Sequence, residues 1–248
     1  MKISVQLYTL RELMGKDPAG TLKELGKMGY RYVETAGTAG KTPQEFAQMI
    51  ADAGMKVSGM HVGLDACEKD LDAVLAEAET LGAPFVIVPW VPESSYKDGW
   101  DKLGMRLQAI GEKVAKAGRE FAYHNHTFEF VMVEGRTGWD RMFEASCPDY
   151  VKAQIDLWWV HCGKLNPAIL VERYGERCRL VHLKDGGDCK AETQLEAGRG
   201  VQKWDEILKA CEKAKVEFGV VELDNCPNPP LESVRVCLEF FRSKGYQA

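Results

Sequence analysis

The sequence predicts an α/β fold, a (β/α)8 barrel formed as a single domain by residues 1–248. Eight short apolar runs alternate with longer amphipathic segments, which is the order of strands and helices in such a barrel. The apolar runs are nearly continuous, as expected for a parallel sheet that helices cover. The length of 248 residues is usual for this fold, and no linker or low-complexity segment indicates a second domain.

The predicted strands are short runs rich in β-branched and aromatic side chains. The fourth of them, with the sequence PFVIVPW, is the most apolar. In chain order, the strands are expected at residues 3–7, 30–34, 56–61, 84–90, 120–125, 151–157, 179–184 and 217–223.

The predicted helices begin at capping residues and end near glycines. Asp17 can cap a helix whose first turn accommodates Pro18, and Thr42-Pro43 begins the next one in the same way. The helices are expected at residues 17–28, 42–54, 71–81, 100–117, 139–145, 167–174, 204–214 and 231–243. A doubly wound open sheet is the alternative fold, but no Gly-x-Gly-x-x-Gly turn follows the first strand. The irregular stretch 186–200 follows the seventh strand, where it could fold over a barrel mouth.

Composition limits the possible partners and compartment. The formal charge is −5, from 32 Lys+Arg and 37 Asp+Glu, which argues against a nucleic-acid partner. None of the eight cysteines forms a C-x-x-C pair, so we expect reduced cysteines and a cytoplasmic protein. The N-terminus enters a strand directly, without an apolar signal core. The sequence contains no apolar run of about eighteen residues, so no membrane partner is expected.

The polar stretch Tyr123–Phe130 (YHNHTFEF) at the end of the fifth strand is the main functional signal. It brings two imidazoles and a carboxylate into a strand end, which is costly unless these groups meet a cation or each other. Asp156, His182 and Glu222 end the three later strands. Because the active site of a barrel lies at the C-terminal ends of its strands, we expect these four places to converge on one metal.

Each of these residues also has a simpler interpretation. Asp156 taken alone is more typical of a helix cap or a turn, and His182 is about as typical of the core as of a ligand. Glu222 follows Val220-Val221, where a solvated carboxylate is hard to explain, so a functional role is favoured. Two carboxylates with one or two imidazoles suit Mn²⁺, Co²⁺, Zn²⁺ or Fe²⁺ better than Ca²⁺.

Other polar and aromatic residues at the strand ends have open interpretations. Glu129 is expected either in the site or facing water on a short hairpin, and His61 either in the site or in the core. Lys184 either forms an ion pair with Asp185 or contacts a substrate. Aromatic residues at the strand ends, which more often pack in a core, could form a wall for a sugar ring; they are Tyr8, Trp90 and Trp158.

Taken together, the strand ends resemble a known family. The chain is similar to the xylose isomerase-like TIM barrels of the sugar phosphate isomerase/epimerase family, nearly from end to end. The resemblance rests on the motifs VQLYTLR at strand one, YVE at two, GMH at three, YHNHTFEF at five, ID with Trp159 at six, VHLKD at seven and VELD at eight. In that family Glu, Asp, His and Glu from strands five to eight typically hold a divalent metal.

The resemblance implies a ligand set with one departure. Asp156, His182 and Glu222 match the family's ligands, whereas His124 stands where many members have a glutamate. Either His124 takes the place of the fourth ligand or Glu129 folds back to supply the carboxylate. His124 is slightly favoured as the ligand, and Glu129 is kept as an acid/base candidate. A second departure is Arg199 in Gly198-Arg199-Gly200, where many relatives have Gly-Glu-Gly; it could bind an anionic or polyhydroxy substrate or face solvent.

The family chemistry is metal-assisted proton abstraction beside a carbonyl of a sugar or keto-sugar. It implies Glu222 or Glu129 as the base and His126 or a second carboxylate as the group that returns the proton. Isomerisation or epimerisation is the first expectation. The changed strand-five motif shifts some weight toward elimination from or hydration of a keto-sugar or keto-inositol.

Two other readings stay open. A phosphodiesterase of the endonuclease-IV type would need a three-metal cluster rich in His and Glu, which five histidines in an acidic chain do not favour. A non-catalytic sugar-binding barrel is the alternative of another class. The substrate is expected to be a small carbohydrate, and a homodimer is compatible with the sequence.

Overall fold

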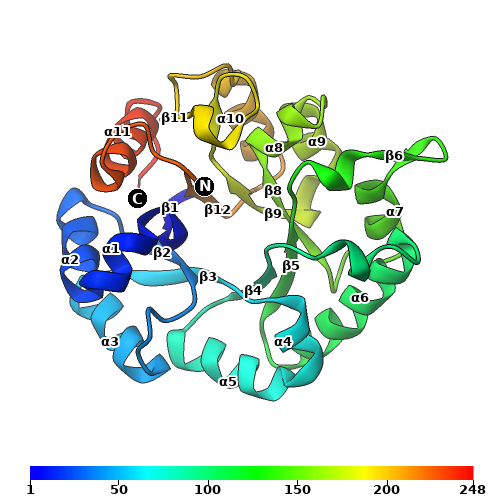
Figure 1. Cartoon of the computed structure of the whole chain (residues 1–248), viewed down its shortest axis with the longest axis horizontal. Coiled ribbons are helices and arrows are strands. Elements are labelled where there is room, and N and C mark those ends of the chain that lie inside the picture. Colours follow the sequence, from blue (N-terminus) through cyan, green and yellow to red (C-terminus); the bar gives the residue numbers. More distant parts are fainter. Residues whose placement is uncertain (248) are drawn as a thin grey trace.

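The computed structural model describes residues 1–247, which form a closed parallel barrel surrounded by helices (Figure 1). The strand order around the barrel is β1-β12-β9-β8-β5-β4-β3-β2, so the last strand closes on the first. The predicted fold is thereby confirmed. The barrel strands are β1 (Lys2–Gln6), β2 (Tyr32–Ala36), β3 (Lys56–His61), β4 (Phe85–Val88), β5 (Glu120–His124), β8 (Lys152–Asp156), β9 (Cys178–His182) and β12 (Phe218–Val221).

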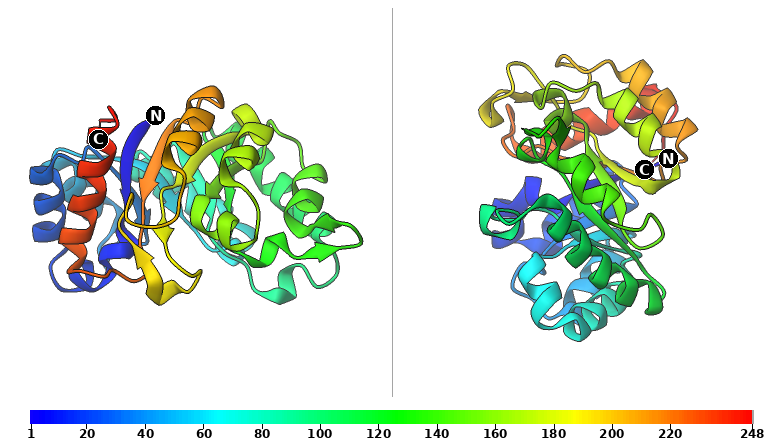
Figure 2. Two further views of the ribbon diagram at one scale, coloured as in Figure 1. Left: turned by 90° about the horizontal axis from the view of Figure 1, so that it is seen from above. Right: turned by 90° about the vertical axis from the view of Figure 1, so that its right-hand side faces the viewer.

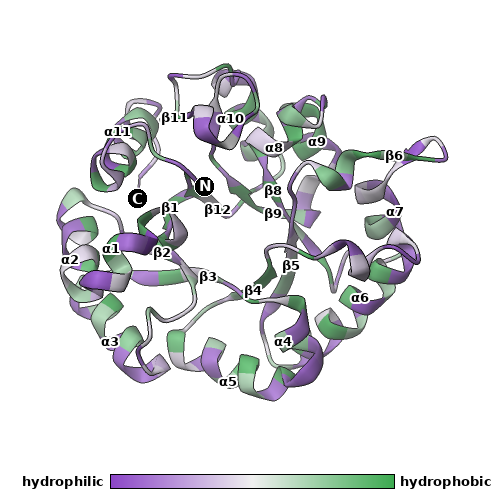
Figure 3. Ribbon diagram, in the orientation of Figure 1, coloured by the Kyte–Doolittle hydropathy of each residue, from purple (hydrophilic) through white to green (hydrophobic). Residues whose placement is uncertain are grey.

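An outer ring of helices covers the barrel, and each helix alternates hydrophilic and hydrophobic residues around its axis (Figure 3). Asp17 accepts a hydrogen bond from Gly20 N at 2.9 Å, and Thr42 forms a capping box with Glu45, as their positions before proline predict. The ring consists of α2 (Pro18–Met28), α3 (Pro43–Asp52), α5 (Leu71–Leu81), α6 (Trp100–Lys116), α7 (Gly138–Glu144), α9 (Pro167–Tyr174), α10 (Trp204–Lys213) and α11 (Pro230–Ser243).

Three further helices of six residues each were not predicted from the sequence. They are α1 (Arg11–Lys16), α4 (Leu64–Lys69) and α8 (Leu157–Cys162). All three follow barrel strands at the C-terminal end of the barrel. Six residues complete fewer than two turns, so no hydrophobic period of 3.6 residues can be recognised in them. Strand β2 also begins two residues later than expected, at Tyr32.

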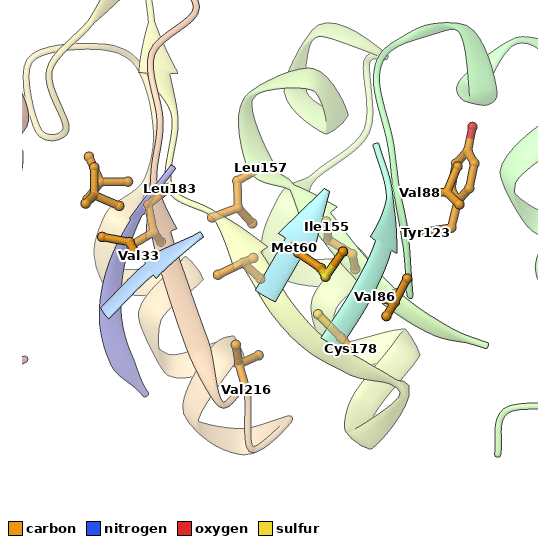
Figure 4. Packing of buried hydrophobic residues seen from close by; sticks show 14 of the residues in the cluster. Val33, Met60, Val86, Val88, Tyr123, Ile155, Leu157, Cys178, Leu183 and Val216 are labelled. Atoms are coloured by element: carbon orange, nitrogen blue, oxygen red, sulfur yellow. The ribbon is translucent and has the colours of Figure 1, made fainter. Parts of the chain in front are cut away.

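Two separate hydrophobic cores hold the fold together. The larger lies between the strands and the helices and includes Val33, Val86 and Ile155 (Figure 4). The smaller fills the N-terminal half of the barrel interior and is called the inner core below; it consists of Phe85, Ile87, Ala122, Leu180, Phe218 and Val220, with Tyr32 packed against it. Toward the C-terminal end of the strands, the interior becomes polar.

Two short hairpins extend from this end of the barrel. Strands β6 (Met132–Val133) and β7 (Arg136–Thr137) form one that projects at the periphery, beyond the ring of helices (Figures 1 and 2). Strands β10 (Asp185–Gly186) and β11 (Gln194–Leu195) form the other, within the predicted irregular stretch after strand seven. Gln194 donates from Nε2 to Asp224 Oδ2 at 2.6 Å, which ties this second hairpin to the end of β12.

Candidate metal centre

Four buried side chains from consecutive barrel strands converge at the C-terminal end of the barrel. His124 ends β5, Asp156 ends β8, His182 ends β9, and Glu222 directly follows β12. One potential ligand atom from each of the four lies within 4.8 Å of the others. The parallel register sets Asp156 opposite His182, so the ends of neighbouring strands present their side chains at one height. These four residues are called the metal-site cluster below.

The two carboxylate oxygens of Asp156 have different surroundings. Oδ1 accepts hydrogen bonds from the backbone N–H groups of Trp158 and Trp159, each at 3.0 Å, and thereby caps α8. Oδ2 instead faces the cluster, 3.8 Å from His124 Nε2 and 4.0 Å from His182 Nδ1. The helix-cap interpretation of Asp156 and its place in the cluster are therefore compatible.

Lys184 introduces a buried ammonium group beside the cluster. Its Nζ lies 3.0 Å from Asp156 Oδ2, 2.8 Å from Glu222 Oε2 and 3.0 Å from Asp224 Oδ2. The alternative of an ion pair between Lys184 and Asp185 is wrong, because Lys184 pairs with Asp156, Glu222 and Asp224 instead. Asp185 points outward and accepts hydrogen bonds from the backbone of residues 198–202 and from Trp204 Nε1, at 2.8 Å for the indole.

The charges in the cluster raise and lower the pKa values of its members. Burial disfavours the His182 imidazolium, but Glu222 and Glu34 outweigh burial and raise its pKa to about 10. Burial also raises the pKa of Asp156, to about 6, although Lys184 and His182 act against it. For Glu222, Lys184 and His182 overcome burial and hold the pKa well below its usual value. The contacting carboxylates outnumber the cations by two, which leaves the region electronegative.

The cluster has the chemistry of a divalent-metal site. Two imidazoles and two carboxylates are ligands that Mn²⁺, Co²⁺, Zn²⁺ and Fe²⁺ accept. His124 Nδ1 is buried without a hydrogen-bond partner, and burial holds the pKa of this ring well below its usual value, so the ring is neutral as a ligand must be. The residues present thus fit a metal ion whose binding would release the proton that His182 holds in its absence. The same electronegativity also suits the ammonium of Lys184.

A network lies directly below the cluster, and the sequence motif YVE, which ends in Glu34, had been given no role in it. Glu34, which is fully buried, accepts hydrogen bonds from His182 Nε2 at 2.7 Å and from Gln6 Nε2 at 2.8 Å. His61 Nε2 lies 2.9 Å from the same carboxylate, and Gln154 donates to its other oxygen. The alternation of β2 places Glu34 inside the barrel, a signal that could have identified it.

His61, a predicted substrate contact, has both ring nitrogens in this network. Its Nε2 lies within hydrogen-bonding distance of Glu34 and of Gln154 Oε1, and its Nδ1 lies 3.3 Å from Gln6 Nε2. The ring stacks on that of His182 at a centroid distance of 5.5 Å. His61 therefore forms part of the site's floor.

Glu129 lies outside the metal-site cluster and does not face water. It is fully buried in a short 3-10 turn, Phe128–Phe130, so the alternative of an exposed hairpin residue is wrong. Its Oε1 accepts from Tyr123 Oη and its Oε2 from the backbone N–H of His126, both at 2.9 Å. Burial raises the pKa of Glu129 to about 8. Glu129 thus holds the loop that carries His126.

The remaining predicted residues lie around the barrel mouth. His126 is half-buried between the rings of Phe128 and Trp159, at centroid distances of 6.0 and 5.9 Å. Burial and the nearby Lys184 lower its pKa to about 4. Tyr8 and Trp90 are exposed after β1 and β4. Arg199 is half-exposed and pairs with Glu196 at 3.1 Å.

The sequence is similar to a known protein family and to several dehydratases. Residues 22–244 match the family described as xylose isomerase-like TIM barrel. An inosose dehydratase of Geobacillus kaustophilus is 23% identical over 188 residues, which cover 66% of this chain and 60% of that protein. Matches to the curated inosose dehydratases span only 29% to 60% of their length.

Two solved structures share the fold over nearly the whole chain. A sugar phosphate isomerase/epimerase from Parabacteroides distasonis superimposes with a TM-score of 0.87 at 22% identity, covering 98% of this chain and 93% of that one. The IolI protein with a bound zinc atom superimposes with a TM-score of 0.78 at 16% identity, covering 98% of this chain and 97% of that one.

Among the described residues, no helix combines the length and apolar character needed to cross a membrane.

Proposed function

The chain belongs to the xylose isomerase-like TIM barrel family, and we propose that it is a divalent-metal-dependent enzyme that removes water from a keto-sugar or keto-cyclitol. One observation carries the proposal: His124, Asp156, His182 and Glu222 bring two imidazoles and two carboxylates within 4.8 Å of one another in the barrel mouth. Such a convergence of buried lone pairs is costly without a cation.

We propose that these four residues hold one ion, Mn²⁺, Co²⁺, Zn²⁺ or Fe²⁺. The IolI protein, which has the same fold, binds a zinc atom, and this supports the proposal of an ion. When bound, the ion would polarise the substrate carbonyl and stabilise negative charge that develops on its oxygen. His124 supplies a neutral ligand where a glutamate would add a further negative charge.

The residues around the cluster divide the remaining work. Glu222, kept ionised by Lys184 and His182, accepts the proton from the carbon beside the carbonyl. Lys184 adds a fixed positive charge 2.8 Å from Glu222 Oε2, where it favours an anionic intermediate. His126 reaches the mouth from the side and hydrogen-bonds the departing hydroxyl group, which takes up the proton held by Glu222 and leaves as water. His61, Trp90, Arg199 and Tyr8 are proposed to contact other parts of the carbohydrate.

Loss of water is favoured over epimerisation because of where the carboxylates lie. Epimerisation removes a proton from one face of a carbon and returns a proton to the opposite face, which needs two acid/base groups. The cluster offers Glu222 as one such group, while the strand-five position carries His124, a residue we assign to the metal. The similarity to inosose dehydratases supports the same choice.

Isomerisation or epimerisation is the second candidate, and Glu129 is the observation that favours it. This carboxyl is buried near Asp156 and has a pKa of about 8, a value suited to proton exchange near neutral pH. Its two oxygens already accept hydrogen bonds from Tyr123 and from His126 N. It would have to exchange those partners for a substrate, which makes this candidate the weaker one.

The test is to incubate Mn²⁺-loaded protein in D₂O with inosose and with a panel of ketoses. Loss of water, followed by ultraviolet absorbance of the unsaturated product, is the expected result with a keto-cyclitol or keto-sugar. Deuterium incorporation without loss of water, abolished in Glu129→Gln, would support the second candidate instead. A metal-loaded protein that binds these sugars without exchanging any substrate proton would be a non-catalytic binding barrel.

A further inference from the structure

Glu34 has the most completely bonded carboxylate in the barrel mouth, and no role in the proposed chemistry. It lies on β2, on the opposite side of the barrel interior from the ends of β8 and β9. Four side-chain N–H donors point at its two oxygens; they belong to Gln6, His61, Gln154 and His182. Each oxygen has at least one donor, so the carboxylate is fixed in place.

The contact with His182 decides which ring nitrogen faces the metal-site cluster. Nε2 donates to Glu34 Oε1 at 2.7 Å, while Nδ1 lies 2.6 Å from Glu222 Oε2 on the other side of the ring. A carboxylate accepts hydrogen bonds only, so both ring nitrogens donate in this structure, Nε2 to Glu34 and Nδ1 to Glu222. Glu222 belongs to the metal-site cluster and Glu34 does not, so Nδ1 is the nitrogen that would give up its proton and bind an ion.

The residues that support Glu34 are themselves held by hydrogen bonds to their neighbours. Gln154 is braced in turn, since its Oε1 lies 2.9 Å from His61 Nε2. Gln6 Oε1 accepts the backbone N–H of Tyr8 at 3.1 Å. The carboxylate therefore cannot rotate away without breaking several buried hydrogen bonds.

We infer that Glu34 is a positioning residue, which fixes the ring orientation and tautomer of His182 so that Nδ1 points into the metal-site cluster. The inference rests on the proposed metal centre and adds a residue from the first half of the barrel to it. Carboxylates that hold the second nitrogen of a metal-binding histidine are a general device for orienting such ligands. Here the carboxylate is shared with a second histidine and two amides, which makes the support unusually rigid.

The experiment measures Zn²⁺ and Mn²⁺ affinity by calorimetry for wild type and Glu34→Gln. The amide keeps the size of the side chain but presents N–H to donors, and we expect metal binding to weaken by about 10- to 100-fold. Ser58→Ala is the matched control. It removes a buried polar contact with Ser4, at 2.7 Å in the same barrel interior, without touching His182, and should leave the affinity unchanged.

A second measurement uses the wild type alone, so it holds even if Glu34→Gln fails to fold. In Zn²⁺-loaded protein, ¹⁵N NMR of the His182 ring should show a protonated Nε2 and a coordinated Nδ1. The opposite assignment, or equal affinities of wild type and Glu34→Gln, would overturn the role of Glu34 while leaving the metal centre intact. Wild type that binds neither ion would overturn the metal centre and this inference together.

Discussion

The two sides of the barrel mouth use polar residues in opposite ways. On the side of β1–β3, the donors of Gln6 and His61 meet the acceptor Glu34, so these groups are mutually satisfied. On the side of β5–β12, carboxylate oxygens and imidazole nitrogens of the metal-site cluster face one another, and Lys184 and His182 together compensate the carboxylates only in part. This difference shows that a metal site is indicated by lone pairs that outnumber the available donors. A group of polar residues does not by itself indicate one.

The largest expected effect on metal binding comes from removing a negative charge on the β5–β12 side of the mouth. Asp156→Asn should weaken Mn²⁺ binding by at least roughly 100-fold, because an amide is a poorer ligand and the cluster loses a negative charge. The fold should survive, since asparagine can still cap α8. Calorimetry of metal binding checks this, with Asp17→Asn, at the cap of α2, as the control. Unchanged Mn²⁺ affinity in Asp156→Asn would contradict the assignment of the metal site to the β5–β12 side of the mouth.

The inner core offers a change that separates stability from metal binding. Phe218→Ala removes a buried ring from the N-terminal half of the barrel interior and should cost about 3–5 kcal/mol of unfolding free energy. Denaturant unfolding measures the loss, and calorimetry on the folded variant should give the metal affinity of wild type. A parallel loss of affinity would show that the polar mouth depends on the packing beneath it.

Strand five tests which of its residues belongs to the cluster. His124→Ala should weaken metal binding by about 10- to 100-fold, because it removes one of four ligands. Glu129→Ala should leave the affinity nearly unchanged, because its oxygens bond to Tyr123 and to the His126 backbone. Metal content by mass spectrometry after dialysis compares the two. The reverse pattern would move Glu129 into the ligand set.

The smallest expected effect is a pH dependence that belongs to Glu129. Its folded pKa of about 8 lies above the unfolded value, so it contributes stability below about pH 4.5 that is lost as pH rises through 8. Glu129→Gln should therefore match the stability of wild type near pH 5 and exceed it at pH 9 by about 1–2 kcal/mol. Denaturant unfolding at both pH values checks this; equal differences at the two pH values would show that Glu129 stays ionised throughout.

Strand ends were the part of the site most accessible to sequence analysis. Asp156, His182 and Glu222 each follow an apolar run, so their convergence could be anticipated once eight strand–helix repeats indicated a barrel. Glu34 was not recognised as a bonding partner of His182, because 148 residues separate them and nothing local marks the contact. The six-residue helices α1, α4 and α8 were also missed, since they are too short for periodicity.

What the sequence by itself determined is the fold class, through its alternation of apolar strands and capped amphipathic helices, and the strand ends where polar groups gather. The tertiary structure alone decided which of these groups meet. The side chain of His124 lies in the metal-site cluster, whereas Glu129 lies in a buried turn. Lys184 contacts Asp156 and Glu222 instead of Asp185. The reason is physical: local patterns report burial and backbone conformation, whereas contacts across a closed barrel depend on the register and tilt of all eight strands.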